Sequence, residues 1–490
     1  MGLSTYNHNN LKTFSRKMSE FEADRGKLTS TGPDPSLIER LVEFLKEQGG
    51  RLDGVEIKKT RFGNDYGLYA NESLPDDKRV LISIPYHMCI SLDTIVSSEM
   101  SVIFNDEHFG GIVQYPDEVM ALGLMAALSP STNLPWALHV MTMPHEFKQS
   151  TLFWEEHELE ELAPCSTYHL TKLMQSQIQI DWDTIHAPIK EAYPQFLSTA
   201  TVDTYKWALS MIYSRAVGFH RQRGRTEEYV RCIPPLLDMA NHFPTSTQYD
   251  ASDTFRFDAS TSSLQLLSIS RKETGQEVFA IYGTYPNSKL AFSYGFVIYN
   301  NPYQAIDLWA KITPQVLMGE QKQAILQSNK LTSNQTYDFE GTIRPNYISP
   351  ALLSTVRIIQ CNDAEIKSGN YKNTFEGVMI SFRNERATYN ALKQLITARM
   401  KSEKTEEDER SLKEMLKIKS DARSISTDRK FMALVIRVQE RELLRDTLTM
   451  LDEWIENLED FKDDYVVPEK SKVGRKEDED LPQGMAQELD

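Results

Sequence analysis

The chain has 490 residues, of which 40% are hydrophobic and 25% are charged, and its net charge is -16. These fractions are typical of globular proteins, the length predicts roughly two to four structural units, and no stretch approaches the roughly 18 apolar residues that a membrane span needs. We therefore expect no membrane contact and no direct nucleic-acid binding, which requires clustered Lys and Arg, whereas the acidity suits a basic protein partner.

Residues 1–35 are predicted to be a disordered lead-in, because they are polar and rich in turn-forming residues. They contain no apolar core of a secretory signal, so we expect a cytoplasmic or nuclear protein. A helix is predicted at 37–45, where leucines recur at helical spacing until Gly49-Gly50 ends the pattern. From 55 to 92 the sequence changes to short β-prone runs separated by turn residues, which predicts a β unit.

The β unit is interrupted by a segment with helical patterns, at about 101–203. A further helix is predicted at 204–216, and strand-like runs then continue from 233 to 298. We therefore expect one β-rich domain over 36–300 that is split by a helical insertion.

The segment 301–465 is predicted to be a helical domain, and 466–490 is predicted to be a disordered acidic tail. On the longest predicted helix, five apolar residues follow one another at spacings of four and three: Leu444, Leu448, Leu451, Ile455 and Leu458. A buried helix face explains this stripe more simply than an intermolecular coiled coil, and we expect a monomer.

The cysteines do not indicate a metal site or disulfides. The four of them lie far apart in the sequence, without the paired C-x-x-C spacing of structural zinc: Cys89, Cys165, Cys232 and Cys361. No carboxylate or cysteine lies at ligand spacing from His242. We therefore expect no bound metal.

Polar residues follow apolar or β-prone runs at two places. The segment 231–244 puts Asn241-His242 at the end of an apolar stretch, and the segment 278–288 puts Tyr282-Gly283 directly after a β-prone run. An unpaired buried polar group costs roughly 1–3 kcal/mol. Tertiary partners or a ligand must therefore satisfy these side chains.

Five motifs occur in one order along the chain: Tyr66-Gly67-Leu68-Tyr69-Ala70, Ser214-Arg215-Ala216, Asn241-His242, Tyr282-Gly283 and Tyr294-Gly295-Phe296. With these motifs the chain resembles the SET-domain protein methyltransferases, in the subclass typified by the plant Rubisco large-subunit lysine methyltransferase, over roughly 55–458. The resemblance implies an α+β fold. A β-rich SET domain with a pseudoknot is split by a helical insertion and followed by an all-α C-terminal substrate-binding domain.

The resemblance implies that S-adenosylmethionine is the cofactor, bound by Tyr66, Gly67, Leu68, Arg215, Asn241, His242 and Tyr282. Backbone at 66–68 would contact the cofactor, Arg215 would pair with its carboxylate, and Asn241-His242 would hold its amino-acid and adenine portions. Simpler interpretations exist, since Gly67 suits a hairpin turn, Arg215 suits a helix end and a lone histidine often fills a core. The surrounding motifs favour the cofactor role.

Tyr282 resembles the catalytic tyrosine of the family. The resemblance implies that its hydroxyl lies where the methyl group leaves the sulfonium, with Tyr249, Tyr294 and Phe296 lining the substrate channel. Aromatic faces stabilise a sulfonium cation, and a narrow channel fixes the line of attack. The cysteine-rich zinc segment of histone-modifying SET enzymes is missing after Phe296, which favours a non-histone substrate.

The scaffold suits two acceptors. Only a neutral lysine amine attacks, and with a pKa of about 10.4 its deprotonation at pH 7 costs roughly 4–5 kcal/mol, which a desolvated site beside a positive charge can offset. A histidine, with a pKa of about 6.5, is already largely neutral. We expect a protein-lysine N-methyltransferase acting on a non-histone protein, such as a ribosomal or other translation-machinery protein. A protein-histidine N-methyltransferase and a catalytically silent SET-fold binding module are the alternatives.

Overall fold

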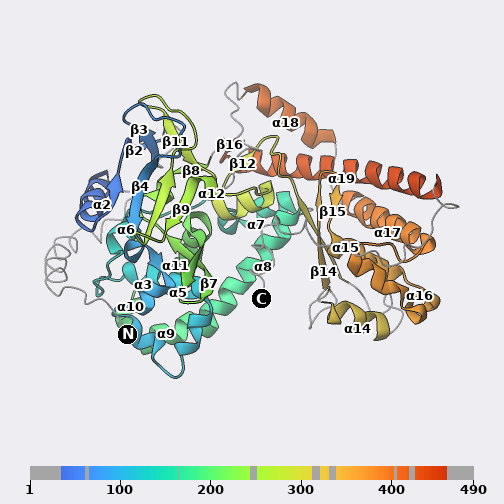
Figure 1. Cartoon of the computed structure of the whole chain (residues 1–490), viewed down its shortest axis with the longest axis horizontal. Helices are drawn as coiled ribbons and strands as arrows, with labels where there is room; N and C mark the ends of the chain where they lie inside the picture. The colour runs from blue at the N-terminus through green and yellow to red at the C-terminus, as the bar shows by residue number, and fades with distance from the viewer. Residues whose placement is uncertain are drawn as a thin grey trace. The chain divides into compact units, whose positions relative to one another are not determined.

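The computed structural model describes residues 35–60, 66–163, 165–242, 251–311, 320–329, 331, 338–401, 406–418 and 425–460. The predicted lead-in up to residue 34 and the predicted tail at 466–490 lie outside these residues. The chain divides into two compact units. Unit 1 takes in the described parts of Met1–Trp309, Glu340–Ile348 and Ala398–Arg445, and unit 2 those of Ala310–Phe339, Ser349–Thr397 and Asp446–Asp490 (Figure 1).

Three small sheets of unit 1 hold the strands that lie before and after the helical segment (Figure 1). The first has the order β1 (Arg51–Leu52), β4 (Val80–Pro85), β10 (Ser263–Leu267), β9 (Phe255–Asp258). The second has the order β2 (Val55–Lys59), β3 (Tyr66–Ala70), β11 (Glu277–Ala280), β8 (Asn241–His242). The third has the order β5 (Ile90–Ser91), β7 (Thr226–Ile233), β6 (Val217–Arg223). Strands from before and after the intervening helices therefore share sheets.

Helices separate the two groups of strands in the sequence: α3 (Leu92–Val96), α4 (Ser101–Phe104), α5 (Pro116–Ala127), α6 (Ala137–Met141), α7 (Glu156–Leu159), α8 (Ser166–Asp181), α9 (Ala187–Ala192), α10 (Pro194–Leu197) and α11 (Val202–Arg215). Helix α5 packs against α11, and its residues from Val119 to Ala127 are all buried. Helix α2 (Pro35–Glu47) turns Leu37, Leu41 and Leu45 into the same core. The sequence pattern therefore places these helices correctly.

The chain then continues through α12 (Ala251–Thr254), α13 (Asn287–Lys289), a π-helical turn at Leu290–Tyr294 and β12 (Val297–Ile298). The side chain of Asn287 is buried and binds the backbone of Ile298 twice, donating to its carbonyl at 2.8 Å and accepting from its N–H at 2.9 Å. The same amide donates to Gln439 Oε1 at 2.7 Å. Gln439 lies on α19 (Arg429–Asp460), so this helix supports the turn before β12.

Residues 398–445 complete unit 1. Strand β16 (Ile425–Ser426) pairs antiparallel with β12, and the start of α19 packs with α18 (Glu406–Ile418) in a second hydrophobic cluster that includes Phe431, Val435 and Leu412. Arg437 is buried and forms an ion pair with Asp408 at 2.7 Å. These contacts bind the late segment to the earlier strands.

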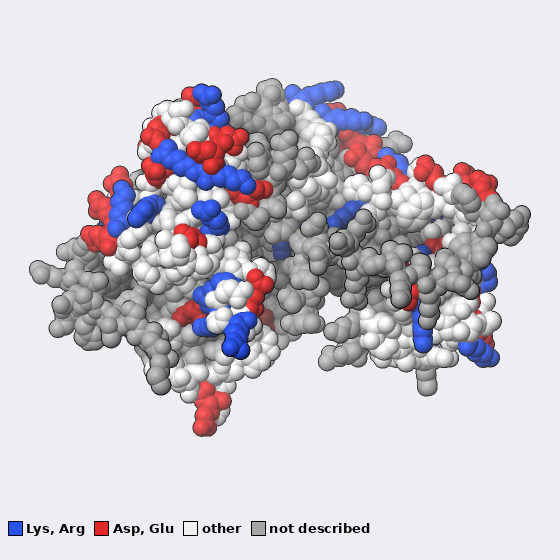
Figure 2. Space-filling model, in the orientation of Figure 1, with Lys and Arg blue, Asp and Glu red and all other residues white. Residues whose placement is uncertain are grey.

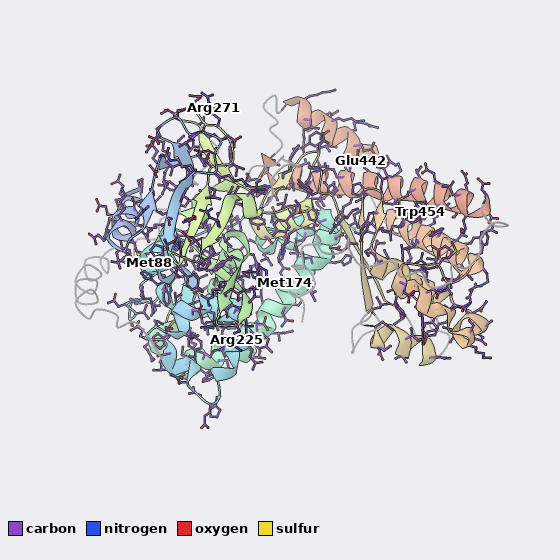
Figure 3. The ribbon with its side chains drawn as sticks, in the orientation of Figure 1. Met88, Met174, Arg225, Arg271, Glu442 and Trp454 are labelled. Atoms are coloured by element: carbon purple, nitrogen blue, oxygen red, sulfur yellow. The ribbon has the colours of Figure 1, made fainter. Side chains whose placement is uncertain are left out.

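Unit 2 is mainly helical, with α14 (Glu320–Ser328), α15 (Pro350–Gln360), α16 (Asp363–Ser368), α17 (Phe382–Lys401) up to Thr397 and the end of α19. Arg357 on α15 pairs with Glu385 on α17, and both side chains are at most 9% exposed. Trp454 (Figure 3) packs its ring 5.3 Å from that of Tyr389. The predicted apolar stripe on α19 is largely buried, since Leu444 and Leu451 are inaccessible to solvent.

The expectation of an all-helical segment after residue 301 missed three strands, β13 (Ile306–Lys311), β14 (Asp338–Arg344) and β15 (Tyr347–Ile348). In β13 the buried Ile306 and Leu308 alternate with the half-buried Asp307, which is the two-residue period of a strand. This short alternation was outweighed by the charge and helical period of the longer segments around it. The long helix that carries the predicted apolar stripe is present as α19.

The surface of unit 1 carries mixed charge. Figure 2 shows acidic and basic side chains interspersed on the face in view, and some of them pair, as Arg79 does with Asp53 at 2.7 Å and with Glu72 at 2.8 Å. Exposed pairs of this kind contribute little to stability. Among the described helices, none has both the length and the apolar content to cross a bilayer.

The π-helical turn ends at Gly295, where only glycine fits. Its φ is +71°, and a Cβ there would lie 2.7 Å from Gln149 Cβ and 2.9 Å from the Ser150 nitrogen. We expect Gly295→Ala to lower the free energy of unfolding by about 3 kcal/mol, because strain and overlap add. Urea denaturation measures this, with Gly224→Ala as the control.

Gly224 has a similar φ of +66° but no atom within 4 Å of a Cβ. Its substitution therefore reports backbone strain alone, about 1–2 kcal/mol. Equal losses in the two variants would contradict the close packing at Gly295.

Candidate active site

Strand β11 brings together segments that lie far apart in the sequence. It pairs parallel with β8, so that Phe279 is opposite Asn241 and Ala280 is opposite His242. On its other edge it pairs antiparallel with β3, so that Val278 is opposite Leu68. Two of the five sequence motifs therefore meet at β11, and a third, Tyr282-Gly283, lies just after this strand.

Gly67, Asn241 and Glu277 lie in contact. The Asn241 Nδ2 donates to Glu277 Oε1 at 2.7 Å, and a Cβ on Gly67 would lie 2.8 Å from that oxygen and 3.0 Å from that nitrogen. A side chain at position 67 would therefore fill the space beside the amide. The sequence analysis missed Glu277, because a single carboxylate at the start of a strand carries no signal of its own.

The Tyr66-Gly67-Leu68 segment forms the first half of β3. Leu68 is fully buried in the core of unit 1, and its strand pairs with β2 on one edge and with β11 on the other. The backbone role that the resemblance implies for Leu68 stays a prediction.

Tyr282 lies beside the Asn241-His242 segment. Its hydroxyl donates to the Ala240 carbonyl at 2.9 Å, and its backbone N–H donates to His242 Nδ1 at 3.2 Å. The two rings stack with their centroids 5.1 Å apart. The phenol predicted to be catalytic is therefore oriented by the backbone immediately before Asn241.

His242 is neutral at physiological pH. Its burial lowers the pKa of the imidazole to about 4, with a smaller opposing effect from the Ala280 backbone. Nδ1 accepts the Tyr282 N–H, so it carries no proton itself. His242 therefore adds no positive charge beside the aromatic rings.

Aromatic rings form a continuous wall next to Tyr282. Tyr294 stacks 4.8 Å from Tyr282, Tyr285 stacks 6.1 Å from Tyr294, and Phe296 lies 6.1 Å from Tyr294 and 5.9 Å from His242. Tyr294 and Phe296 were predicted from the sequence, whereas Tyr285 was missed although it lies only three residues after Tyr282. We call Tyr282, Tyr285, Tyr294 and Phe296 the aromatic wall. The predicted channel residue Tyr249 lies outside the described residues.

Arg215 is the last residue of α11, where a cation is favoured by the helix dipole. Its Nη1 donates to Asp238 Oδ2 at 3.1 Å and to the Asp238 carbonyl at 3.2 Å. Its Nε is buried without a hydrogen-bond partner among the described residues. Asp238 lies three residues before Asn241, so Arg215 is attached to the same turn as the Asn-His pair.

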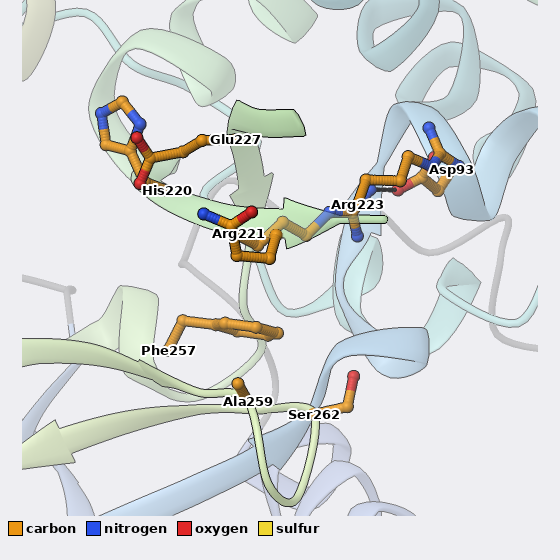
Figure 4. A pocket seen from close by; sticks show the side chains of 9 residues that line it. Asp93, His220, Arg221, Arg223, Glu227, Phe257, Ala259 and Ser262 are labelled. Atoms are coloured by element: carbon orange, nitrogen blue, oxygen red, sulfur yellow. Dashed lines mark hydrogen bonds and ion pairs between the residues drawn. The ribbon is translucent and has the colours of Figure 1, made fainter. Parts of the chain in front are cut away.

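Two other features do not coincide with this site. Within the described ranges, no group of three or more His, Cys, Asp or Glu side chains is arranged to hold a metal ion. A hollow of about 500 Å³ is lined by Asp93, His220, Arg221, Gln222, Arg223, Glu227, Phe257, Ala259 and Ser262 (Figure 4), none of which was predicted as a site residue. Its arginines are neutralised by Asp93 and Glu228.

Comparison with known proteins adds a family model and several relatives. The model described as Rubisco LSMT substrate-binding matches residues 317–444. SET domain-containing protein 4 of Mus musculus is 24% identical over 71% of this chain and 77% of its own. The Pisum sativum ribulose-1,5 bisphosphate carboxylase/oxygenase large subunit N-methyltransferase is 24% identical over 79% and 78%. The actin-histidine N-methyltransferase of Gallus gallus is 20% identical over 82% and 66%.

Solved structures show the same fold. The SET domain of LSMT bound to MeLysine and AdoHcy superposes with a TM-score of 0.68 at 21% identity, covering 89% of this chain and 98% of that one. Rubisco LSMT bound to AdoMet gives a TM-score of 0.68 at 20% identity, covering 88% and 97%. The predicted fold class and the predicted resemblance are confirmed.

The burial of His242 predicts a pH-dependent stability. Its pKa is near 6.5 when unfolded and about 4 when folded, so below pH 6.5 the unfolded chain binds a proton that the folded chain does not. The neutral imidazole therefore contributes about 3 kcal/mol to the free energy of unfolding. This contribution is complete above pH 6.5 and is lost as the pH falls toward 4. We expect His242→Gln to flatten the profile of unfolding free energy between pH 6.5 and 4.

The measurement compares denaturation midpoints of parent and variant across that pH range. The matched control is His108→Gln, whose side chain is 86% exposed and should leave the parent profile unchanged. Parallel profiles for the parent and His242→Gln would contradict a buried neutral imidazole.

Proposed function

The chain is homologous to Rubisco LSMT and SET domain proteins and folds like the SET domain of LSMT, and from this premise we propose that it is an S-adenosylmethionine-dependent protein N-methyltransferase. Its acceptor in this proposal is a lysine of a non-histone protein. The observation that carries the proposal is the position of Tyr282, whose hydroxyl is fixed by the Ala240 carbonyl beside Asn241 and against the aromatic wall.

The residues present fit the cofactor at Arg215. Its unpartnered Nε is a buried donor suited to a carboxylate. The absence of a Cβ at Gly67 lets the Asn241 amide and the Glu277 carboxylate lie close against β3. The related LSMT structures were solved with AdoMet and AdoHcy, which supports the predicted cofactor. When bound, S-adenosylmethionine would supply a methyl group on a positively charged sulfur.

Tyr282 is suited to orient a methyl transfer. Its hydroxyl hydrogen is used by the Ala240 carbonyl, so toward the polarised hydrogens of a methyl group the hydroxyl would act through its oxygen, as an acceptor, rather than as a proton donor. Because the hydroxyl needs no reorientation during the reaction, its position helps to define the line of attack. Tyr282 would thus act by orientation and electrostatics rather than by taking the proton.

The aromatic wall supports lysine as the acceptor. The Tyr282 ring stacks on Tyr294 and on the neutral His242, Tyr294 in turn contacts Tyr285 and Phe296, and none of these five side chains is a carboxylate. Such a surface excludes water and disfavours the charged amine, which lowers the pKa of a bound lysine. Its π faces also suit the methylammonium product. An imidazole acceptor would instead need a polar partner to fix its tautomer.

The partner in this proposal is a basic protein, in keeping with the net charge of -16. The match of residues 317–444 to a substrate-binding model supports a role for this segment in holding that protein. We propose a substrate in the translation machinery, met in the cytoplasm or nucleus.

Replacing Tyr282 by Phe tests the proposed role of the hydroxyl. We expect the rate of methyl transfer to fall about 100-fold, because one preorganised polar group at the reacting centre is removed, while cofactor affinity changes little. Transfer of label from tritiated S-adenosylmethionine to a substrate protein gives the rate, and calorimetry gives the affinity.

The matched control is Tyr115→Phe, since Tyr115 is 56% exposed and outside the site. Undiminished transfer by Tyr282→Phe would refute the role of the phenol. A parent protein that binds cofactor but labels nothing would indicate a silent binding module.

The identity of the acceptor is tested with a lysate from cells that lack this protein. We expect the purified protein and labelled cofactor to methylate a basic protein on lysine Nζ, which mass spectrometry of the labelled band locates. The control is the same incubation with Tyr282→Phe, which should leave the band unlabelled. A methylated histidine in that band would replace the proposed lysine activity with histidine methylation.

A further inference from the structure

A buried histidine in the helical segment before β6 contacts the carboxylate that binds Arg215. We propose that His139 is a positioning residue, which acts through Asp238 to hold the Arg215 guanidinium in the orientation that receives the cofactor carboxylate. The inference rests on the proposed function, because it assumes the cofactor named there.

Three residues from separate parts of the chain meet on one carboxylate. His139 lies on α6 and is 2% exposed, and its Nε2 is 3.1 Å from Asp238 Oδ2. Arg215 Nη1 is 3.1 Å from the same oxygen. The Asp238 side chain is only 1% exposed. His139 and Arg215 therefore share Oδ2 from two sides.

The shared oxygen limits how Arg215 can bind. Its Nη1 is used by the Asp238 side chain and carbonyl, whereas Nε is buried and makes no hydrogen bond to a described residue. Nε and Nη2 form the parallel pair of donors that binds a planar carboxylate in bidentate fashion. Asp238 thus binds the guanidinium at Nη1 and leaves the side formed by Nε and Nη2 for a ligand.

His139 keeps Asp238 from binding the Arg215 guanidinium through both carboxylate oxygens. Asp238 Oδ1 has no partner in the described part of the chain, so without His139 the carboxylate would have Arg215 as its main partner. Burial alone would raise the pKa of Asp238, but His139 and Arg215 outweigh it and keep the group ionised. A buried carboxylate that loses one partner gains most by binding the other through both oxygens. Arg215 would then turn its donor edge toward Asp238 and away from the ligand.

A second buried pair supplies a matched comparison. His186 is 0% exposed, and its Nε2 is 2.7 Å from Glu118 Oε2. Tyr205 also binds that carboxylate, and the contacts of His186 and Glu118 within the described part of the chain do not involve Arg215. Replacing His186 therefore disturbs a buried histidine–carboxylate pair of the same kind without changing the guanidinium.

The test compares two ligands on the full-length protein. S-adenosylhomocysteine carries the carboxylate, and 5′-methylthioadenosine has the same adenosine and sulfur without it. Calorimetry should show that His139→Phe weakens S-adenosylhomocysteine binding about 10-fold, a loss typical for a residue that orients a ligand-binding group, while 5′-methylthioadenosine affinity changes less than about 2-fold. His139→Gln, which keeps an N–H donor within reach of Asp238, should restore most of the lost affinity. His186→Phe should leave the ratio of the two affinities at the parent value.

Each outcome bears on the inference. Equal weakening of both ligands by His139→Phe would show a merely structural role, and unchanged binding would show no role; either overturns the inference while leaving the proposed function intact. A parent protein that binds neither ligand contradicts the proposed function and with it the inference. Where His139→Phe fails to fold, His139→Asn, which is polar but too short to reach Asp238, is measured against His139→Gln and is expected to show the same selective loss.

Discussion

The parallel pairing of β8 with β11 is the constraint on which the candidate site depends. Tyr282 and His242 are 40 positions apart in the sequence, and the register that sets Ala280 opposite His242 is what brings the phenol to the Ala240 carbonyl. Because β11 also pairs with β3, the same strand sets Gly67 beside Asn241. A shift of this register by one residue would turn each side chain of the strand to the opposite face of the sheet. The geometry of the site therefore depends on the pairing of these strands.

The unsatisfied polar atoms near the site are concentrated around Arg215. The Asn241 amide, the Tyr282 hydroxyl and the His242 Nδ1 all have partners, whereas Arg215 Nε, Asp238 Oδ1 and His139 Nδ1 have none among the described residues. An unmet buried polar group costs about 1–3 kcal/mol, which a folded protein tolerates most readily where a ligand supplies the missing partner. Of these three atoms, Arg215 Nε is the donor that an anion would satisfy.

Much of the fold and part of the site could be predicted from the sequence. Leucines at helical spacing placed α2 and α19, and the ordered motifs placed Asn241, His242, Tyr282, Tyr294 and Phe296 in one neighbourhood. Glu277, Tyr285 and the pair formed by His139 with Asp238 were missed, because each acquires its role only from contacts across the fold. Strand β13 was missed because a strand of six residues carries little weight within a long helical segment.

Residues 398–445 belong to unit 1 although the whole of 349–397 precedes them in unit 2. Gln439 binds both Asn287 and Gln304, and Ile425 pairs with Ile298. During synthesis the ribosome delivers these partners only after more than four-fifths of the chain has emerged, so the nascent first three hundred residues carry an unpaired edge at β12. The sheet of β12 and β16 can therefore close only late in the synthesis of the chain.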